Sequence, residues 1–217
     1  MPSNRVKYRH AFNSLDELIE IGRAKEVGGV YHCPHCGAKM IRRCGDNNAW
    51  HFAHLRQKNC DYSHYLHTIA ELQIQQWINT SIEVNLCVFP REYCNMRGQC
   101  NFYSDNACIR TVESPKKYNL KTYYGECERE KRIIVGEHSF VADLLWHHKK
   151  DPKLDILIEV HVTNPCSELK INSGARIIEF NVQSEDDLES IINKPIIGQL
   201  DDIYFEYTKL YNFILKI

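Results

Sequence analysis

The chain has 217 residues, of which 43% are hydrophobic and 25% are charged, and its formal net charge at pH 7 is -1. This length fits one domain of ordinary size, or one domain with a small module, and the apolar fraction is sufficient for a buried core. The apolar runs are too short to span a bilayer, and the first residues hold no signal-peptide stretch. We therefore expect a cytoplasmic protein with no membrane association.

The ten cysteines and the uneven charge both bear on possible ligands. In a reducing cytosol, cysteines clustered near histidines bind metal more often than they form disulfides. Residues 1–60 carry ten Lys or Arg against five Asp or Glu, whereas residues 183–217 carry three against seven. A basic N-terminal part would attract a phosphate backbone, although the solvation of a small module explains the same charges equally well.

The N-terminal third predicts a helix, a hairpin and a second helix, in that order. Residues 14–17, Ser-Leu-Asp-Glu, have the spacing of a capping box, which predicts a short helix that ends near residues 28–29. Residues 39–43 and 49–53 flank a Gly-Asp-Asn-Asn turn and predict a hairpin. Over residues 62–78, apolar side chains recur every three or four positions, which predicts a helix.

The rest of the chain predicts strands interleaved with helices. Residues 90–118 are polar and cysteine-bearing, so irregular structure is expected there. This order predicts an α/β fold with one interrupted sheet. The apolar residues of the last segment would pack on the core or bind a partner. The expected strands are residues 82–89, 127–135, 139–146, 155–163 and 175–182, and the expected helices are residues 168–173, 184–193 and 199–215.

A set of metal-ligand side chains lies within 28 residues of the N-terminal part. Cys33 and Cys36 occupy a Cys-Pro-His-Cys-Gly turn, in which both thiolates can reach one ion. His51, His54 and Cys60 follow at the distance of the second half of a tetrahedral zinc site, which takes four of these five ligands. The two histidines would point to opposite sides of a regular strand, so both bind only if the strand ends between them. Otherwise Cys60 is the fourth ligand of a closed, structural site.

Two carboxylates in apolar strands indicate a second kind of metal site. Asp143 interrupts the run Phe-Val-Ala-Asp-Leu-Leu-Trp, and a buried carboxylate without a partner is costly. Glu159 lies in the middle of the strand expected over residues 155–163, with His161 on the same face. Rigid carboxylates of this kind hold Mg²⁺ or Mn²⁺, which brings a hydrolytic water against a phosphate.

The spacing of these residues forms the pattern D…(D/E)-x-K, with His161 where lysine is usual. A histidine there can bind the metal, donate to a phosphate oxygen or accept a proton. We expect His161 to participate directly, with Lys170 of the following short helix in support. His67 and Glu71 lie four apart on one helical face, which would bring Glu71 to the site and His67 to the phosphate. A solvent-facing pair is an equally good interpretation of that spacing.

Together these motifs resemble the competence-protein (CoiA-like) nuclease family of the PD-(D/E)XK superfamily. The resemblance implies a restriction-endonuclease-like fold that acts on DNA, in which Asp143 and Glu159 match the metal-binding acids. The family commonly has Gln or Lys where this chain has His161. The resemblance covers roughly residues 30–182, and its motifs are Tyr31-x-Cys-Pro-x-Cys, His51-Phe-Ala-His54, Cys60, Tyr65-Leu-His-x-x-Ala-Glu71, Val141-Ala-Asp-Leu-Leu145, Ile158-Glu-Val160 and Arg176-Ile-Ile-Glu179.

The resemblance and the residues lead to one expected organisation. The fold class is α/β, a restriction-endonuclease-like mixed sheet flanked by helices, with a small N-terminal zinc-binding β-hairpin module. Residues 1–60 form an N-terminal helix and the zinc-binding module. Residues 61–182 form the nuclease core, with a cysteine-bearing insertion near residues 87–127. Residues 183–217 form C-terminal helices, through which a protein partner or a second copy of the chain would bind.

The middle cysteines allow a second metal site. Cys94, Cys100 and Cys108 lie in a stretch with little apolar content, where metal can stabilise a loop that has no core. Zinc fits this stretch better than an iron–sulfur cluster, although some nucleases of related fold carry such a cluster. The spacings are wide, so unligated and partly buried thiols are the alternative.

The predicted function is a DNA nuclease that needs Mg²⁺ or Mn²⁺ for catalysis and zinc for structure, and DNA is its expected partner. DNA uptake, repair and defence against foreign DNA are all compatible with such a nuclease. The alternative is a zinc-dependent nucleic-acid-binding protein with an inactive nuclease fold, which the missing motif lysine favours. A cysteine-based redox sensor is a weaker interpretation, because no Cys-x-x-Cys stands at a helix N-terminus as thioredoxin-like chemistry requires.

Overall fold

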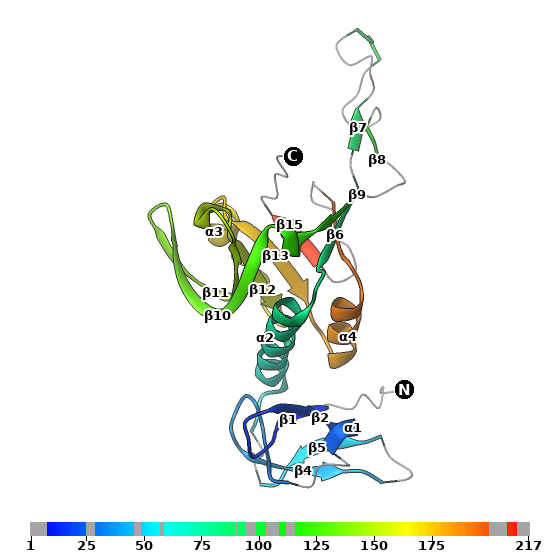
Figure 1. The fold of residues 1–217 in the computed structure, drawn as a ribbon, viewed down its shortest axis with the longest axis vertical. Helices are drawn as coiled ribbons and strands as arrows, with labels where there is room; N and C mark the ends of the chain where they lie inside the picture. Colours follow the sequence, from blue (N-terminus) through cyan, green and yellow to red (C-terminus); the bar gives the residue numbers. More distant parts are fainter. Residues whose placement is uncertain are drawn as a thin grey trace.

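The computed structural model describes residues 8–24, 29–45, 49–56, 59–89, 91–93, 99–102, 109–111, 116–199 and 208–211. Figure 1 shows a smaller N-terminal body of short strands and a larger body built around a central sheet. The longest helix, α2 (Tyr62–Thr80), leads from the first body into the second and confirms the helix predicted over residues 62–78. No helix in the described part of the chain combines the length and the apolar character that crossing a membrane requires.

The N-terminal body is a five-stranded sheet with one short helix at its edge (Figure 1). Its hairpin pairs Met40 with His54 and Arg43 with His51, which confirms the hairpin predicted there. Met40 and Phe52 point inward and are fully buried. In spatial order the strands are β2 (Leu18–Glu20), β1 (His10–Phe12), β3 (Tyr31–His32), β4 (Lys39–Arg43) and β5 (His51–His54), and the helix is α1 (Ile21–Ala24).

The helix predicted from the capping-box spacing at residues 14–17 is wrong, because Asn13 turns this segment into a hairpin. Its Oδ1 atom accepts hydrogen bonds from the backbone N–H groups of Leu15 and Glu17, both at 2.9 Å. Asp16 adopts a left-handed φ of 57° and closes the turn between β1 and β2. Side-chain capping of this kind competes with helix formation, and the described part of this segment contains only the single helical turn α1.

The larger body is built on a mixed sheet, as expected, but the described strands of the chain form several separate sheets and not the one interrupted sheet predicted. The parallel pair is β12 and β13, and the other neighbours are antiparallel. Its core has two faces, since Ile156 and Ile158 pack with the residues of α2, whereas Leu157 and Ile177 pack with Ile171. In spatial order the strands are β10 (Tyr124–Val135), β11 (His138–His148), β12 (Ile156–His161), β13 (Arg176–Asn181) and β15 (Thr208–Tyr211), and α3 (Glu168–Ile171) holds Ile171.

The described residues of the C-terminal part include one helix, α4, and two strands, of which β15 pairs with the central sheet. Helix α4 (Glu185–Asn193) confirms the prediction for residues 184–193. The helix predicted over residues 199–215 is wrong at residues 208–211, which form β15 beside the buried strand β13. Pairing with a buried strand outweighs helical spacing. Most of the remaining stretch lies outside the described residues, and so does most of the partner-binding helix that we expected there.

The stretch expected to be irregular contains three short strands. A small sheet joins β14 (Ile196–Gln199), β6 (Asn85–Phe89) and β9 (Lys116–Asn119), and a separate pair joins β7 (Arg91–Tyr93) and β8 (Ile109–Thr111). Figure 1 shows β7 and β8 projecting away from the central sheet. Single 3-10 turns, residues Leu120–Thr122 and Pro152–Leu154, connect the longer elements.

Buried polar side chains tie the N-terminal body to α2 and α4. The Tyr65 hydroxyl lies 3.1 Å from both the backbone N and the backbone O of His10, and 3.0 Å from Oε1 of Glu185. Glu185 also accepts a hydrogen bond of 2.8 Å from the backbone N–H of Arg9, and its other oxygen contacts the His10 imidazole. The Glu185 side chain is only 2% exposed. Tyr65 and Glu185 therefore fasten the first strand onto the larger body.

Tyr65→Phe is expected to lower the free energy of unfolding by about 1–3 kcal/mol, because Glu185 stays buried with one hydrogen bond fewer. For a chain of this size, each kcal/mol lowers Tm by about 2–4 °C. Differential scanning calorimetry measures the change. Tyr123→Phe is the control, since this tyrosine is 51% exposed and its replacement should leave Tm unchanged. An unchanged Tm in Tyr65→Phe would show that the buried network adds nothing to stability.

Candidate functional site

Four side chains of the N-terminal body form a group that could hold a metal ion. Cys33 and Cys36 lie in the turn between β3 and β4, His54 ends β5, and Cys60 precedes α2. Their ligand atoms all lie within 4.8 Å of one another. The Sγ atoms of Cys33 and Cys60 are 3.8 Å apart, and Sγ of Cys36 lies 3.4 Å from Nε2 of His54.

These separations fit a tetrahedral zinc ion. Bonds of about 2.3 Å to sulfur and about 2.0 Å to nitrogen place two ligand sulfurs about 3.8 Å apart, and a sulfur and a nitrogen about 3.5 Å apart. Three thiolates and one imidazole leave no open position for a substrate. The group therefore has the donor set of a structural zinc site rather than a catalytic one.

His51, the fifth candidate ligand, lies outside this group. Strand β5 continues through both histidines, so the condition for both to bind is not met. The Nδ1 atom of His51 lies 2.9 Å from the backbone O of Ala49. Cys60 takes the fourth position, as the sequence requires when the strand does not end between the two histidines.

Burial shifts the pKa of three of these side chains, Cys33, His54 and Cys60. It raises the pKa of the Cys33 thiol, and burial together with the nearby Cys33 sulfur raises the pKa of the Cys60 thiol. Burial also lowers the pKa of His54, which keeps its imidazole neutral. The Tyr8 ring packs edge-on against His54, with the ring centroids 5.0 Å apart. Thiols in such surroundings ionise when a divalent cation compensates their charge, so metal binding here releases protons.

Asp143, the first acid of the predicted nuclease pattern, lies where β11 and β12 separate. The last residue pair between these strands is Leu144 opposite Ile158. Beyond it, Oδ2 of Asp143 accepts the backbone N–H of Val160 at 2.8 Å. The carboxylate therefore closes the end of the ladder and lies in the gap between two diverging strands.

The backbone of β10 is irregular opposite Asp143. Glu130 adopts a left-handed φ of 51°, which is uncommon for a residue other than glycine, although the pairs on either side of it keep their register. The alternation of side chains along β11 also breaks at this place. Residues two apart on a regular strand share a face, but Leu144 packs in the core beneath α2 and Ala142 packs in the core on the other face of the sheet. This break in alternation directs Asp143 toward the gap.

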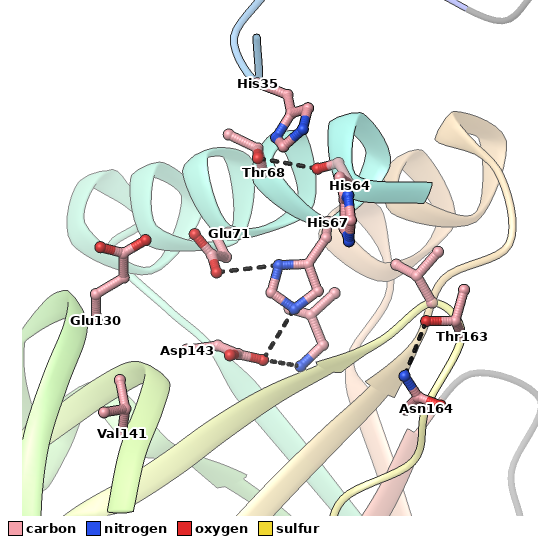
Figure 2. A pocket seen from close by; sticks show the side chains of 12 residues that line it. His35, His64, His67, Thr68, Glu71, Glu130, Val141, Asp143, Thr163 and Asn164 are labelled. Atoms are coloured by element: carbon pink, nitrogen blue, oxygen red, sulfur yellow. Dashed lines mark hydrogen bonds and ion pairs between the residues drawn. The ribbon is translucent and has the colours of Figure 1, made fainter. Parts of the chain in front are cut away.

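Helix α2 brings His67 and Glu71 to Asp143 (Figure 2). Nε2 of His67 lies 3.3 Å from Asp143 Oδ2, and Nδ1 lies 3.1 Å from Glu71 Oε1. Glu71 also accepts two hydrogen bonds from Arg129, at 2.6 and 3.0 Å. Hydrogen bonds to Asp143 and Glu71 raise the pKa of His67 to about 10 against the opposing effect of burial. The imidazole is therefore a cation held between two carboxylates at neutral pH.

Glu159 and Lys170 form a second pair next to Asp143. The Nζ atom of Lys170 lies 2.7 Å from Oε2 of Glu159 and donates to the backbone O of Val141 at 2.9 Å. Burial and repulsion from Asp143 raise the pKa of Glu159 to about 7, although the ammonium of Lys170 opposes them. Oε1 of Glu159 is buried and has no hydrogen-bond partner in the part of the chain that the structure describes.

His161, which we expected beside Glu159, has a different neighbour. Its Nδ1 atom lies 3.9 Å from Oε1 of Glu179, on the adjacent parallel strand β13. The contact expected of the motif residue is made instead by Lys170, eleven positions after the acid. The structure thus brings together Asp143 with His67 and Glu71, and Glu159 with Lys170, but it places His161 at the edge of this group.

A pocket of about 610 Å³ lies along the α2 side of these residues (Figure 2). Asp143, His67 and Glu71 line it, whereas Glu159, His161 and Lys170 are not among its lining residues. Sequence reasoning missed several other lining residues, including His35, His64 and Asn164. The only signal for His64 is its position one helical turn before His67, and nothing in the sequence alone joins His35 or Asn164 to this site.

The proposed second metal site in the middle of the chain lies mostly outside the described residues. Cys94 and Cys108 are not described, and Cys100 is half-buried and forms no disulfide. Cys127 is fully buried on β10, and burial raises the pKa of its thiol to about 12. Its backbone is held by Asn79, whose Oδ1 accepts its N–H at 2.8 Å. Cys127 is therefore a core thiol.

Comparison with known proteins gives one match, in the N-terminal body. Residues 16–63 match the family model described as competence protein CoiA, N-terminal domain. This segment contains all four members of the Cys33–Cys60 metal-binding group. No curated protein and no solved structure matches the chain. Over these residues the chain is therefore similar to the N-terminal domain of CoiA.

Proposed function

We propose that this chain is a divalent-metal-dependent deoxyribonuclease that hydrolyses phosphodiester bonds, with a structural zinc ion in its N-terminal body. The observation that carries the proposal is the placement of Asp143 in the gap between β11 and β12, with Glu159 and Lys170 on one side and His67 and the pocket on the other. Competence-related processing or defence against foreign DNA would use this activity. Rigid carboxylates at a strand end are the ligands that Mg²⁺ and Mn²⁺ prefer.

The charges at this place fit a divalent cation. Glu159 Oε1 is a buried carboxylate oxygen without a hydrogen-bond partner in the described part of the chain, and Asp143 repels it. Two carboxylates in this relation are relieved by a cation between them. Asp143 and Glu159 would therefore hold Mg²⁺ or Mn²⁺, which supplies a polarised phosphate and an activated water.

The remaining residues have separate tasks in this proposal. Lys170 is bound to Glu159 and to a backbone oxygen, so its positive charge is fixed beside Glu159 and would stabilise the negative charge that develops during hydrolysis. His67 contacts both Glu71 and Asp143 and lines the pocket. It would hold the Asp143 carboxylate in position and contact the phosphate of the substrate. Glu71 is itself oriented by Arg129. His161 remains a candidate catalytic residue, but Lys170 can perform the function that the sequence pattern gave to His161.

A second candidate is a nucleic-acid-binding protein with an inactive nuclease fold. The observation in its favour is His67, a cation that is ion-paired with both Asp143 and Glu71. In that case DNA would bind to the zinc-loaded protein, but Mg²⁺ and Mn²⁺ would produce no cleavage.

The test is cleavage of labelled single- and double-stranded DNA by the zinc-loaded protein, with Mg²⁺, with Mn²⁺ and with neither. We expect cleavage only with one of the two ions. Lys170→Met should then lower kcat by about a hundredfold, as removal of one stabilising charge from a reaction does, and His161→Ala should lower it much less. A larger loss of kcat in His161→Ala than in Lys170→Met would assign the role of the motif lysine to His161. Binding without cleavage under all three conditions would favour the inactive fold.

A further inference from the structure

We infer that His35 and His64 form the entry wall of the pocket and bind a single strand of nucleic acid on its way to Asp143. The inference rests on the proposed nuclease function and names the place at which its substrate enters. It also gives the zinc-bearing turn a direct part in substrate binding.

Two histidines from different bodies of the protein meet at the edge of the pocket. His35 lies in the turn between the first two members of the zinc group, and His64 lies in the first turn of α2. Their ring centroids are 5.2 Å apart, the ring planes are tilted by 41°, and both line the pocket. Figure 2 shows His35, His64 and His67 following one another from the zinc-bearing turn toward Asp143.

The two rings have the properties of a nucleic-acid contact. Both histidines are exposed, and each offers a π-face for a base and an N–H for a phosphate oxygen. Since the rings already contact each other, a base would stack on the outer side of the pair rather than between them. Thr163 and Asn164, in the loop after β12, line the same pocket and add polar groups that can contact phosphate or a base edge.

The size of the pocket selects one strand over two. Its volume of about 610 Å³ lies within the range of about 300–1,000 Å³ that is typical of pockets for small ligands. A cube of that volume has edges of about 8.5 Å, less than the width of roughly 12 Å of the B-DNA major groove alone. The pocket can therefore enclose a segment of one strand, but not both strands of an intact duplex.

The test uses the full zinc-loaded chain carrying Asp143→Asn, so that bound DNA is not cut, and a fluorescein-labelled single-stranded oligodeoxynucleotide. Fluorescence anisotropy gives Kd. His35→Ala and His64→Ala are each expected to raise Kd about fivefold or more, the effect of losing one aromatic contact with a base. The matched control is His32→Ala, three residues from His35 and not among the pocket's lining residues, which should leave Kd unchanged. Zinc is measured in every variant.

A Kd within about twofold of the parent for both pocket variants, at unchanged zinc content, overturns the inference. Cleavage kinetics of His35→Ala and His64→Ala in chains that retain Asp143 distinguish this inference from the nuclease proposal. Loss of a contact at the pocket entrance should raise KM and leave kcat nearly unchanged. Cleavage with an unchanged KM in both variants would contradict the role of His35 and His64 in substrate entry and would still support the nuclease proposal. If the protein does not cleave DNA but its binding still depends on His35 and His64, the nuclease proposal is contradicted and the proposed binding role of the two histidines is supported.

Discussion

Cys60→Ser is expected to leave the purified protein without zinc and to unfold its N-terminal body. A closed zinc site contributes about 10–16 kcal/mol of binding free energy to folding, and a body this small has little core with which to replace it. Serine cannot supply a thiolate, so only three ligands remain. Elemental analysis should find one zinc ion on each parent chain and none on the variant. Limited proteolysis of the variant should cut before α2 first.

His51→Ala is the matched control for this experiment, because His51 was an equal candidate from the sequence but lies outside the group of four. It should keep its zinc and the protease resistance of the parent. A parent protein purified without zinc would contradict the site. Loss of zinc from His51→Ala would instead return that residue to the ligand set.

Asp143→Asn and Glu159→Gln are each expected to lower the rate of cleavage on the order of a thousandfold. Each change removes one metal ligand, and a metal that is lost or misplaced forfeits several kcal/mol of transition-state stabilisation. Single-turnover cleavage of labelled DNA with Mg²⁺ or Mn²⁺ measures the effect. Glu137→Gln is the control, since this acid is exposed at the turn of the β10–β11 hairpin and should be replaceable without loss.

Neither acid substitution should unfold the protein. Asp143 and Glu159 repel each other when no cation lies between them, so neutralising one of them relieves repulsion. The thermal unfolding of Glu159→Gln should therefore begin no earlier than that of the parent. A variant that cleaves DNA at the parent's rate would show that the acid is misassigned, whatever its stability.

The zinc group was the part of the site that could be predicted best, because its spacing is local. Cys33 and Cys36 share one turn, and the hairpin returns His54 beside them. The choice between Cys60 and His51 as the fourth ligand depended only on whether β5 ends between the two histidines. Such geometry depends on a few consecutive residues, which the sequence specifies directly.

The catalytic group could be predicted only in part, because its members come from four separate elements. Alternation along β12 correctly placed Glu159 and His161 on one face, but it could not show that Lys170 of α3 folds back onto Glu159. The contact between Arg129 and Glu71 joins residues 58 positions apart and has no sequence signal. The assignments of catalytic roles remain predictions.

Two secondary-structure predictions failed because other contacts outweighed local patterns. Ser14 has capping-box spacing, but the Asn13 side chain holds the next residues in a turn. Residues 208–211 have helical spacing, but β13 offers them a strand with which to pair. Periodicity shows which side chains are apolar, and it does not show which neighbour they meet.

The buried tie between the first strand and α4 sets an order of events during synthesis. Arg9 and Glu185 are joined by a hydrogen bond across 176 positions of the chain. A ribosome adds about 5–20 residues per second, so Glu185 is made about 10–35 s after Arg9. Cys33, Cys36, His54 and Cys60 are all translated long before then. Until α4 emerges, a metal ion bound by these four side chains would stabilise the nascent N-terminal body in place of its final docking partner.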